Sequence, residues 1–272
     1  MCGPISDGTG SPLPGWSTSY MGPLAASPAA LANVVNGSDL NHRLRRFSYI
    51  EFRALRECSS DESFVQMGFA RQSEFETYLL DVATPSENEL WDQLASTCRN
   101  RIRKARKSNV SVEFETDASF IDEFWEMSLD VFAKWGLRPQ FSKSLLSRMR
   151  DELADGGIST LTARRDGQRI AMLLLLIDHR SMYYLAGGSL PELNRFAPNN
   201  LLHWEAILEA KRMGLRSYDF VSASGTAGKF KKTFGPRQVV TSTSWNRSRT
   251  CAEELLKQSY EKYIRWKRGA KG

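Results

Sequence analysis

Cysteine and histidine are scarce in this chain of 272 residues, which has four cysteines and three histidines. The cysteines show no CxxC spacing, and a chain of this length does not need disulfide bonds, so we expect reduced thiols. The histidines lie far apart and form no HxxxH pattern. The sequence therefore predicts no metal site.

Long apolar runs are also lacking. The longest, Ile170–Ile177, is far shorter than the ~20 residues that a membrane-spanning helix needs. Residues 1–15 are rich in Gly, Pro and Ser but have no basic start followed by an apolar core, so we expect a flexible arm and no signal peptide. These features predict a cytoplasmic protein whose contact with membranes is at most peripheral.

Positive charge is in modest excess. Lys and Arg number 37 and Asp and Glu number 31, which gives a net charge of +6. Such a balance favours an anionic partner such as nucleic acid, a nucleotide or a membrane surface. A slightly basic enzyme without an anionic partner fits the same numbers, so charge alone does not decide between them.

Hydrophobic periodicity predicts alternating helices and strands. Before the centre of the chain, we expect strands at residues 47–55, 63–69, 75–80 and 110–115, with one helix at 86–107. The central stretch, residues 117–221, is predicted to hold two helices, three strands in tight succession, a helix and a strand. Asp117 and Ser142 are expected to cap the two helices, and Asp166-Gly167 indicates a hairpin turn.

Three stretches stand in a specific order and spacing. The first is Leu90-Trp91 followed by Arg99-Asn-Arg-Ile-Arg-Lys-Ala105. The second comprises Tyr184-Leu-Ala-Gly-Gly188, Pro198-Asn-Asn-Leu-Leu-His-Trp204 and Tyr218-Asp-Phe220. The third is Gly228-Lys-Phe-Lys-Lys-Thr-Phe-Gly235. Together they resemble the FemAB-like, Fem-type aminoacyltransferases, which have a GNAT-like acyltransferase fold.

This resemblance implies an α+β fold of GNAT type with one complete unit and a partial second one. We expect the complete, catalytic unit at residues 108–235. Residues 16–107 and 236–272 would form the partial first unit, which includes the basic helix. Because only the arm at residues 1–15 precedes it, the first unit is expected to be shortened, and in the family this unit contributes to acceptor binding.

The resemblance also implies an activity. Fem-type proteins transfer an amino acid from aminoacyl-tRNA to an amine on a peptidoglycan precursor. We therefore expect an aminoacyltransferase that acts as a monomer without a cofactor, with aminoacyl-tRNA or acyl-CoA as donor and a cell-envelope amine as acceptor.

The segment Arg195-Phe-Ala-Pro-Asn-Asn200 stands where an ordinary GNAT enzyme binds the pyrophosphate of coenzyme A in a glycine-rich loop. Pro198 has no N–H to donate, and Asn200 replaces a glycine. The altered loop favours a donor other than acetyl-CoA. Arg195 and Asn200 are candidates to bind a phosphate or the terminal adenosine of tRNA.

The resemblance places catalysis at Lys231, in the pair Phe230-Lys231, as the cation that stabilises the developing oxyanion. Asp219 is a candidate to hold the attacking amine or take its proton. Tyr184 and Phe230 are candidates to contact the substrate. Plainer roles remain open: Lys231 in a solvated basic loop, Asp219 as a capping residue and Tyr184 in the core.

One face of the helix predicted at residues 86–107 is strongly basic. Its side chains could bind tRNA or a diphosphate, or they could simply be a solvated helix face. The residues are Arg99, Arg101, Arg103, Lys104, Arg106 and Lys107.

Two other functions remain open on the sequence. One is a GNAT-like N-acyltransferase that uses an acyl thioester in polysaccharide or lipid biosynthesis. The other is a nucleic-acid-binding pseudo-enzyme that uses the basic helix face.

Overall fold

The computed structural model describes residues 49–55, 61–115, 120–133, 141–153 and 156–248, and a few single residues outside these ranges. The arm at residues 1–15 and the Asp117 cap lie outside the described residues. The chain divides into two compact units, residues 1–76 with 240–272 and residues 77–239. The expected boundaries of GNAT-like units at residues 108 and 235 stay a prediction.

The smaller unit contains β1 (Tyr49–Leu55), α3 (Asp61–Gln66), the start of β2 (Ala70–Asp81) and most of β8 (Arg237–Ser248). β1 runs antiparallel to β8. The strand predicted at residues 63–69 is wrong, because helix α3 occupies its start. Acidic residues in the first turn favour a helix there, and Phe64 and Met67, three positions apart, are both buried.

The larger unit is built on a sheet in the order β2-β7-β6-β5-β4-β3, to which β2 contributes its last residues. Its other strands are β3 (Ser111–Glu115), β4 (Ile158–Arg165), β5 (Gln168–Ile177), β6 (Ser181–Ser189) and β7 (Ser217–Asp219). β3 to β6 form an antiparallel meander, whereas β6 and β7 are parallel. The hairpin at Asp166-Gly167 is confirmed, and both residues have positive φ, 50° and 76°.

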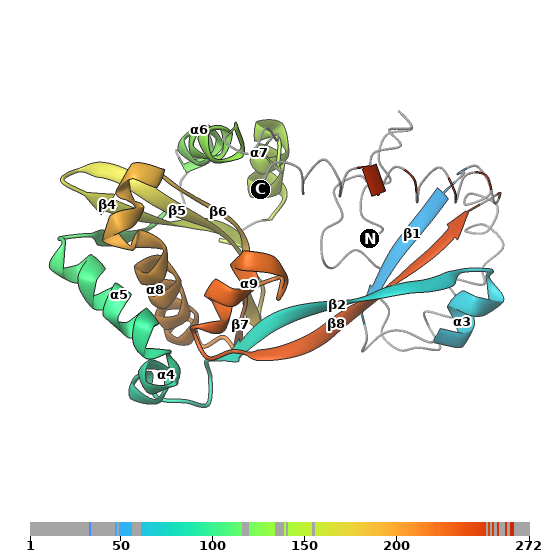
Figure 1. Ribbon diagram of the computed structural model, residues 1–272, viewed down its shortest axis with the longest axis horizontal. Coiled ribbons are helices and arrows are strands. Elements are labelled where there is room, and N and C mark those ends of the chain that lie inside the picture. The colour runs from blue at the N-terminus through green and yellow to red at the C-terminus, as the bar shows by residue number, and fades with distance from the viewer. Residues whose placement is uncertain are drawn as a thin grey trace. The chain divides into compact units, whose positions relative to one another are not determined.

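Helices cover both faces of this sheet (Figure 1). α5 (Ser96–Lys107) and α8 (Pro198–Arg212) pack on one face, and α6 (Phe120–Ala133) and α7 (Lys143–Glu152) pack on the other. The α7 cap is confirmed, since Ser142 Oγ accepts from Leu145 N at 3.2 Å. The remaining helices are α4 (Glu87–Gln93), the 3-10 helix η2 (Pro191–Phe196) and α9 (Gly225–Lys232).

The single helix predicted at residues 86–107 is in fact two, α4 and α5. The chain is extended at Leu94 and Ala95, and Ala95 N donates to Thr233 O at 2.9 Å. Arg99 Nη1 donates to the carbonyl oxygens of Asp92 and Leu94, each at 3.0 Å. The break is therefore stabilised by tertiary hydrogen bonds that periodicity does not reveal.

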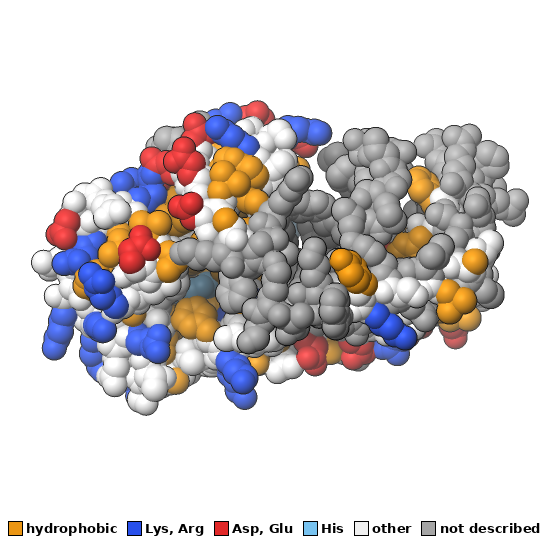
Figure 2. Space-filling model, turned by 45° about the horizontal axis from the view of Figure 1, so that its top comes forward, with side chains coloured by type: hydrophobic (Ala, Val, Ile, Leu, Met, Phe, Trp, Pro, Cys, Tyr) orange, Lys and Arg blue, Asp and Glu red, His pale blue; other side chains and the backbone are white. Residues whose placement is uncertain are grey.

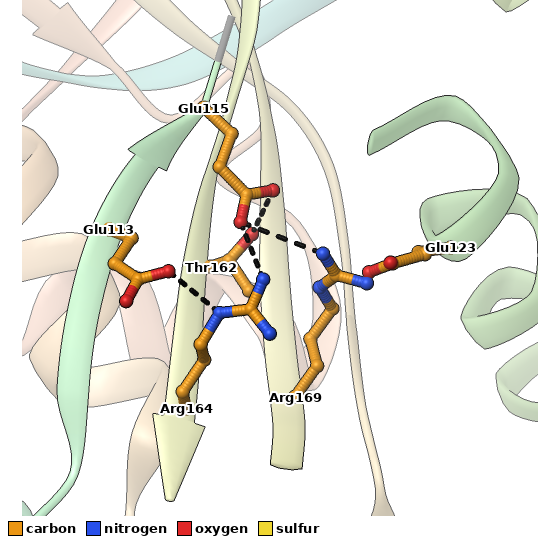
Figure 3. Close-up of polar contacts among 6 residues, drawn as sticks. All are labelled: Glu113, Glu115, Glu123, Thr162, Arg164 and Arg169. Atoms are coloured by element: carbon orange, nitrogen blue, oxygen red, sulfur yellow. Dashed lines mark hydrogen bonds and ion pairs between the residues drawn. The ribbon is translucent and has the colours of Figure 1, made fainter. Parts of the chain in front are cut away.

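An ion-pair network ties three strands to α6 (Figure 3). Arg164 binds Glu113 at 2.7 Å and Glu115 at 2.9 Å. Arg169 binds Glu115 at 3.6 Å and also pairs with Glu123 of α6. Arg169 is largely buried beneath α6, and burial of an unpaired guanidinium costs free energy. The two carboxylates offset this cost.

Two adjacent leucines in α7 test the packing of this helix. Leu146 is fully buried, whereas its neighbour Leu145 is 36% exposed. We expect Leu146→Ala to lower the free energy of unfolding by about 2–5 kcal/mol. Leu145→Ala should change it by about 0.5 kcal/mol or less. Chemical denaturation measures both, and equal losses would contradict the described burial.

Candidate active site

The parallel strands β6 and β7 pair over only a short length. Ser181, Met182 and Tyr183 lie opposite Ser217, Tyr218 and Asp219. β6 then continues to Ser189, while β7 ends and the chain turns toward α9. A register shift against β5 between Leu174 and Leu175 marks a bulge in the same part of β6. Tyr184 is thus the first residue of β6 beyond the paired segment.

Lys231 in the last turn of α9 reaches this point. Its side chain is buried, with 6% exposure, and Nζ donates to Phe220 O at 2.7 Å and to Ser222 O at 3.2 Å. The Nζ atom also lies 5.2 Å from the centroid of the Tyr184 ring. An ammonium has three N–H donors, so these two hydrogen bonds leave a third donor.

Burial lowers the pKa of Lys231 to about 8, and the negative charge of Asp219 opposes this shift. Lys231 is therefore mostly protonated at pH 7. A fixed, partly desolvated cation of this kind interacts with a developing anion more strongly than a hydrated one does.

Asp219 is buried, and its carboxylate is engaged by neighbours. Oδ1 accepts from Thr77 Oγ1 at 2.5 Å and from Val221 N at 2.6 Å. Val221 has a φ of 63°, which is unusual for a β-branched residue. The described contacts are those of a residue that holds a turn.

An aromatic cluster surrounds His203 of α8. His203 Nδ1 and Tyr218 Oη form a hydrogen bond of 2.9 Å. Burial and then the charge of Lys231 lower the pKa of His203 to about 3, so its ring is neutral. Burial raises the pKa of Tyr184 to about 12. The rings that lie near the imidazole are those of Tyr184, Tyr218, Phe220, Phe230 and Phe234.

The start of α8 differs from an open phosphate cradle. Pro198 occupies the first turn, and Asn200 is buried, with its Nδ2 3.6 Å from Cys98 Sγ. The Asn200 amide therefore faces α5. The guanidinium groups of Arg165 and Arg195 lie 4.0 Å and 4.7 Å from the centroid of the Phe196 ring.

The basic face of α5 is exposed, and positively charged side chains gather over the part of the larger unit where α4 and α5 lie (Figure 2). Arg106 is paired with Glu205 at 2.9 Å, and Arg103 lies over the Trp91 ring. Arg99 donates hydrogen bonds to backbone carbonyls at the end of α4. Among the described residues, no ion pair engages the three remaining cations, Arg101, Lys104 and Lys107.

The structure thus brings four of the predicted site residues together: Lys231, Asp219, Tyr184 and Phe230. Arg195 belongs to a second location at η2, and the basic side chains belong to α5. Sequence reasoning missed His203, Thr77 and Val221, and the stretch that contains His203 was noticed only for its resemblance. No group of three or more His, Cys, Asp or Glu within the described part of the chain is arranged to hold a metal ion.

A family profile described as the acetyltransferase (GNAT) domain matches residues 93–232. The chain belongs to this GNAT family. It is an acyltransferase, as the sequence predicts. No curated protein matches the chain. No helix among the described residues is long and apolar enough to cross a membrane.

Solved structures of similar fold include FemX, with 15% identity and a TM-score of 0.67 over 85% of this chain and 79% of that one. L-PGS from Bacillus licheniformis is 11% identical, with a TM-score of 0.57 over 80% and 75%. A tandem GNAT protein from the clavulanic acid biosynthesis pathway is 12% identical, with a TM-score of 0.52 over 81% and 69%. The predicted GNAT-like α+β fold, similar to that of FemX, is confirmed.

The neutral state of His203 predicts a pH dependence of stability. An unfolded histidine has a pKa of about 6.5. Below that pH the histidine is protonated in the unfolded chain, whereas His203 stays neutral in the folded chain. This contribution is fully present above pH 6.5 and is lost as the pH falls toward 3. Between pH 7 and pH 5 we expect a loss of about 2 kcal/mol in the free energy of unfolding.

Chemical denaturation at several pH values measures this loss. His203→Gln should remove the contribution, whereas His179→Gln, at an exposed position, should leave it in place. An unchanged pH dependence in His203→Gln would show that another group is responsible.

Proposed function

We propose that this acyltransferase moves an aminoacyl group from aminoacyl-tRNA to an amine of a cell-wall, peptidoglycan precursor. The observation that carries the proposal is the buried Lys231 ammonium, which uses two of its three N–H donors among the described residues and lies beside the part of β6 that extends past β7. The enzyme would act in the cytoplasm as a monomer, with at most peripheral contact with the membrane. Residues 16–107 and 236–272 would contribute to the acceptor site.

The reaction is attack of an amine on an ester carbonyl. A new C–N amide bond forms, the C–O ester bond breaks, and the tRNA ribose oxygen leaves as a hydroxyl that takes up the proton lost by the amine. Negative charge then develops on the carbonyl oxygen, and a donor fixed beforehand at that position lowers the barrier. Lys231 fits this role because it is held by two carbonyls and needs little reorganisation. In the proposed complex, Tyr184 and Phe230 flank the acyl group.

The start of α8 favours a donor without coenzyme A. Glycines usually allow backbone N–H groups to approach a pyrophosphate closely. Here Pro198 removes one N–H and the Asn200 side chain points into the core. Arg165 and Arg195, which both lie over the Phe196 ring, offer guanidinium groups that suit phosphates of a nucleic acid instead.

The basic face of α5 continues toward these arginines. Arg165 Nε donates at 3.1 Å to the carbonyl of Ser108, which directly follows Lys107 at the end of α5. The cations of α5 and of the Phe196 stack therefore form one tract, which we propose contacts the tRNA phosphates. The C-terminal domain of a putative lysylphosphatidylglycerol synthetase from Agrobacterium fabrum has a similar fold, with 13% identity and a TM-score of 0.53, and supports the proposal of aminoacyl transfer to an envelope component.

A second candidate is N-acyl transfer from an acyl thioester to an amine in polysaccharide or lipid biosynthesis. The description of the matching family as an acetyltransferase domain favours it. Labelled aminoacyl-tRNA and labelled acetyl-CoA, each incubated with the enzyme and an amine-bearing cell-wall precursor, separate the two. Label from the tRNA alone supports our proposal, and label from acetyl-CoA alone supports the second candidate.

Lys231→Ala should lower kcat about a hundredfold or more, because one oxyanion donor is worth roughly that factor. The exposed neighbour Lys232 provides the control, and Lys232→Ala should transfer at nearly the rate of the original protein. Circular dichroism of both variants checks the fold. Equal rates in the two variants would remove Lys231 from the mechanism.

Replacement of Arg101, Lys104 and Lys107 by Gln should weaken tRNA binding and flatten its salt dependence. Each lost phosphate contact reduces the slope of log K against log salt by about 0.7–0.9, so we expect a reduction of about 2–3. Filter binding at a series of salt concentrations measures this slope. The control, Lys143→Gln with Arg148→Gln, removes two positive charges on the opposite face of the sheet and should keep the original slope.

A further inference from the structure

The turn between β7 and α9 contains the least expected backbone conformation of the described residues. Four non-glycine residues in the described part of the chain have a positive φ: Asn109, Asp166, Ala197 and Val221. Of these four, only Val221 is β-branched, and it lies in this turn. Such a residue is strained in this region, and it persists only where its surroundings fix it. The strained residue lies between the two carbonyls that hold Lys231.

We infer that Asp219 and Thr77 are positioning residues, which hold Val221 in its left-handed turn so that the carbonyls of Phe220 and Ser222 converge on the Lys231 ammonium. This inference rests on the proposed function for its activity readout. In this inference Asp219 acts by holding the backbone of the turn. It does not contact the attacking amine, which was the role considered from the sequence.

The geometry of the turn explains why these positioning residues, which we call the clamp of Thr77 and Asp219, are needed. In an extended strand, alternate carbonyls point the same way but lie about 6.8 Å apart, at roughly 3.4 Å per residue. Here Phe220 O and Ser222 O lie 2.7 Å and 3.2 Å from a single nitrogen, Lys231 Nζ. The chain has to fold back at Val221 to bring them together.

The clamp is a chain of short hydrogen bonds. Thr77 Oγ1, fully buried on β2, donates to Asp219 Oδ1 at 2.5 Å, and the same oxygen accepts from Val221 N at 2.6 Å. Phe220 N is fixed as well, since it donates to Tyr78 O at 2.9 Å. β2 therefore anchors the residues on both sides of the Asp219–Phe220 peptide.

Close packing of α9 against the turn brings Lys231 within reach. A Cβ atom on Gly228 would lie 2.2 Å from Ala223 O, so only glycine allows this approach. Gly228 stands one helical turn before Lys231. The turn and the helix are thus fitted to each other at two points, the Gly228 contact and the Lys231 ammonium.

The charged and titratable groups around the ammonium come from three elements. Asp219 on β7 favours the protonated amine. The ring of Tyr184 on β6 lies against it, and the neutral His203 on α8 is affected by its charge. Loss of the Asp219 charge should therefore favour the neutral amine and make the cation disappear at a lower pH.

The test compares Thr77→Val, Asp219→Asn and the control Thr226→Val, which removes a hydroxyl at an exposed position of α9. We expect kcat to fall about 10- to 100-fold in the first two variants, with the KM for aminoacyl-tRNA nearly unchanged. In Asp219→Asn, the decline of kcat at high pH should move to lower pH. Thr226→Val should match the original protein.

A second substitution makes the test specific to the turn. Glycine adopts a positive φ without strain, so Val221→Gly added to Thr77→Val should restore much of the lost kcat. A role in stability alone predicts no such recovery per folded molecule. Unchanged kcat in both Thr77→Val and Asp219→Asn, with Lys231→Ala inactive, would overturn the inference and leave the proposed function standing.

If the original protein transfers no aminoacyl group, the proposed function fails and the clamp is tested by nitrogen NMR of labelled lysine. The Lys231 signal, assigned by its loss in Lys231→Ala, should titrate at a lower pH in Asp219→Asn and shift in Thr77→Val. The inference is overturned if neither variant changes this signal.

Discussion

The proposed active site depends on one buried ammonium. Lys231 leaves water, which costs free energy unless the charge is compensated, and two backbone carbonyls together with the Tyr184 ring replace its hydration. Those carbonyls are available because β7 is short and the chain turns sharply at Val221. Gly228 lets α9 approach closely enough for the side chain to reach them. A longer β7, a relaxed turn or a larger residue at position 228 would each remove the lysine from its place.

The surrounding sheet places this lysine beside the part of β6 that extends past β7. β6 pairs with β7 over three residues and then continues past β7 while still paired with β5, with a bulge against β5 at the same level. Tyr184 stands at that point, and His203 from α8 fills the space behind it as a neutral ring. The GNAT fold thus supplies the separation of β6 from β7, and this chain's own residues supply the buried cation and the start of α8 on which the proposal of an aminoacyl ester donor rests.

Local patterns predicted much of the fold. The Asp166-Gly167 hairpin and the Ser142 cap depend on neighbouring residues alone, and both are confirmed. The break at Leu94 and Ala95 escaped prediction because its hydrogen bonds come from Thr233 and Arg99. Lys231 was found through a sequence motif and placed in a loop as the plainer alternative, whereas it lies in α9. Thr77, 142 residues from Asp219, carries no local signal of its contact. Hydrophobic periodicity predicts which face of an element is buried. It does not predict which polar groups distant in the sequence form hydrogen bonds.

The central claim is that Lys231 Nζ binds the acyl oxygen of an aminoacyl ester. A crystal structure with a non-hydrolysable aminoacyl-adenosine, in which an amide replaces the ester, tests it most directly. We predict the acyl oxygen within hydrogen-bond distance of Lys231 Nζ, with the Phe220 and Ser222 carbonyls still bound to the same nitrogen. An acyl oxygen held by other donors, with Lys231 remote from the bound analogue, would contradict the account.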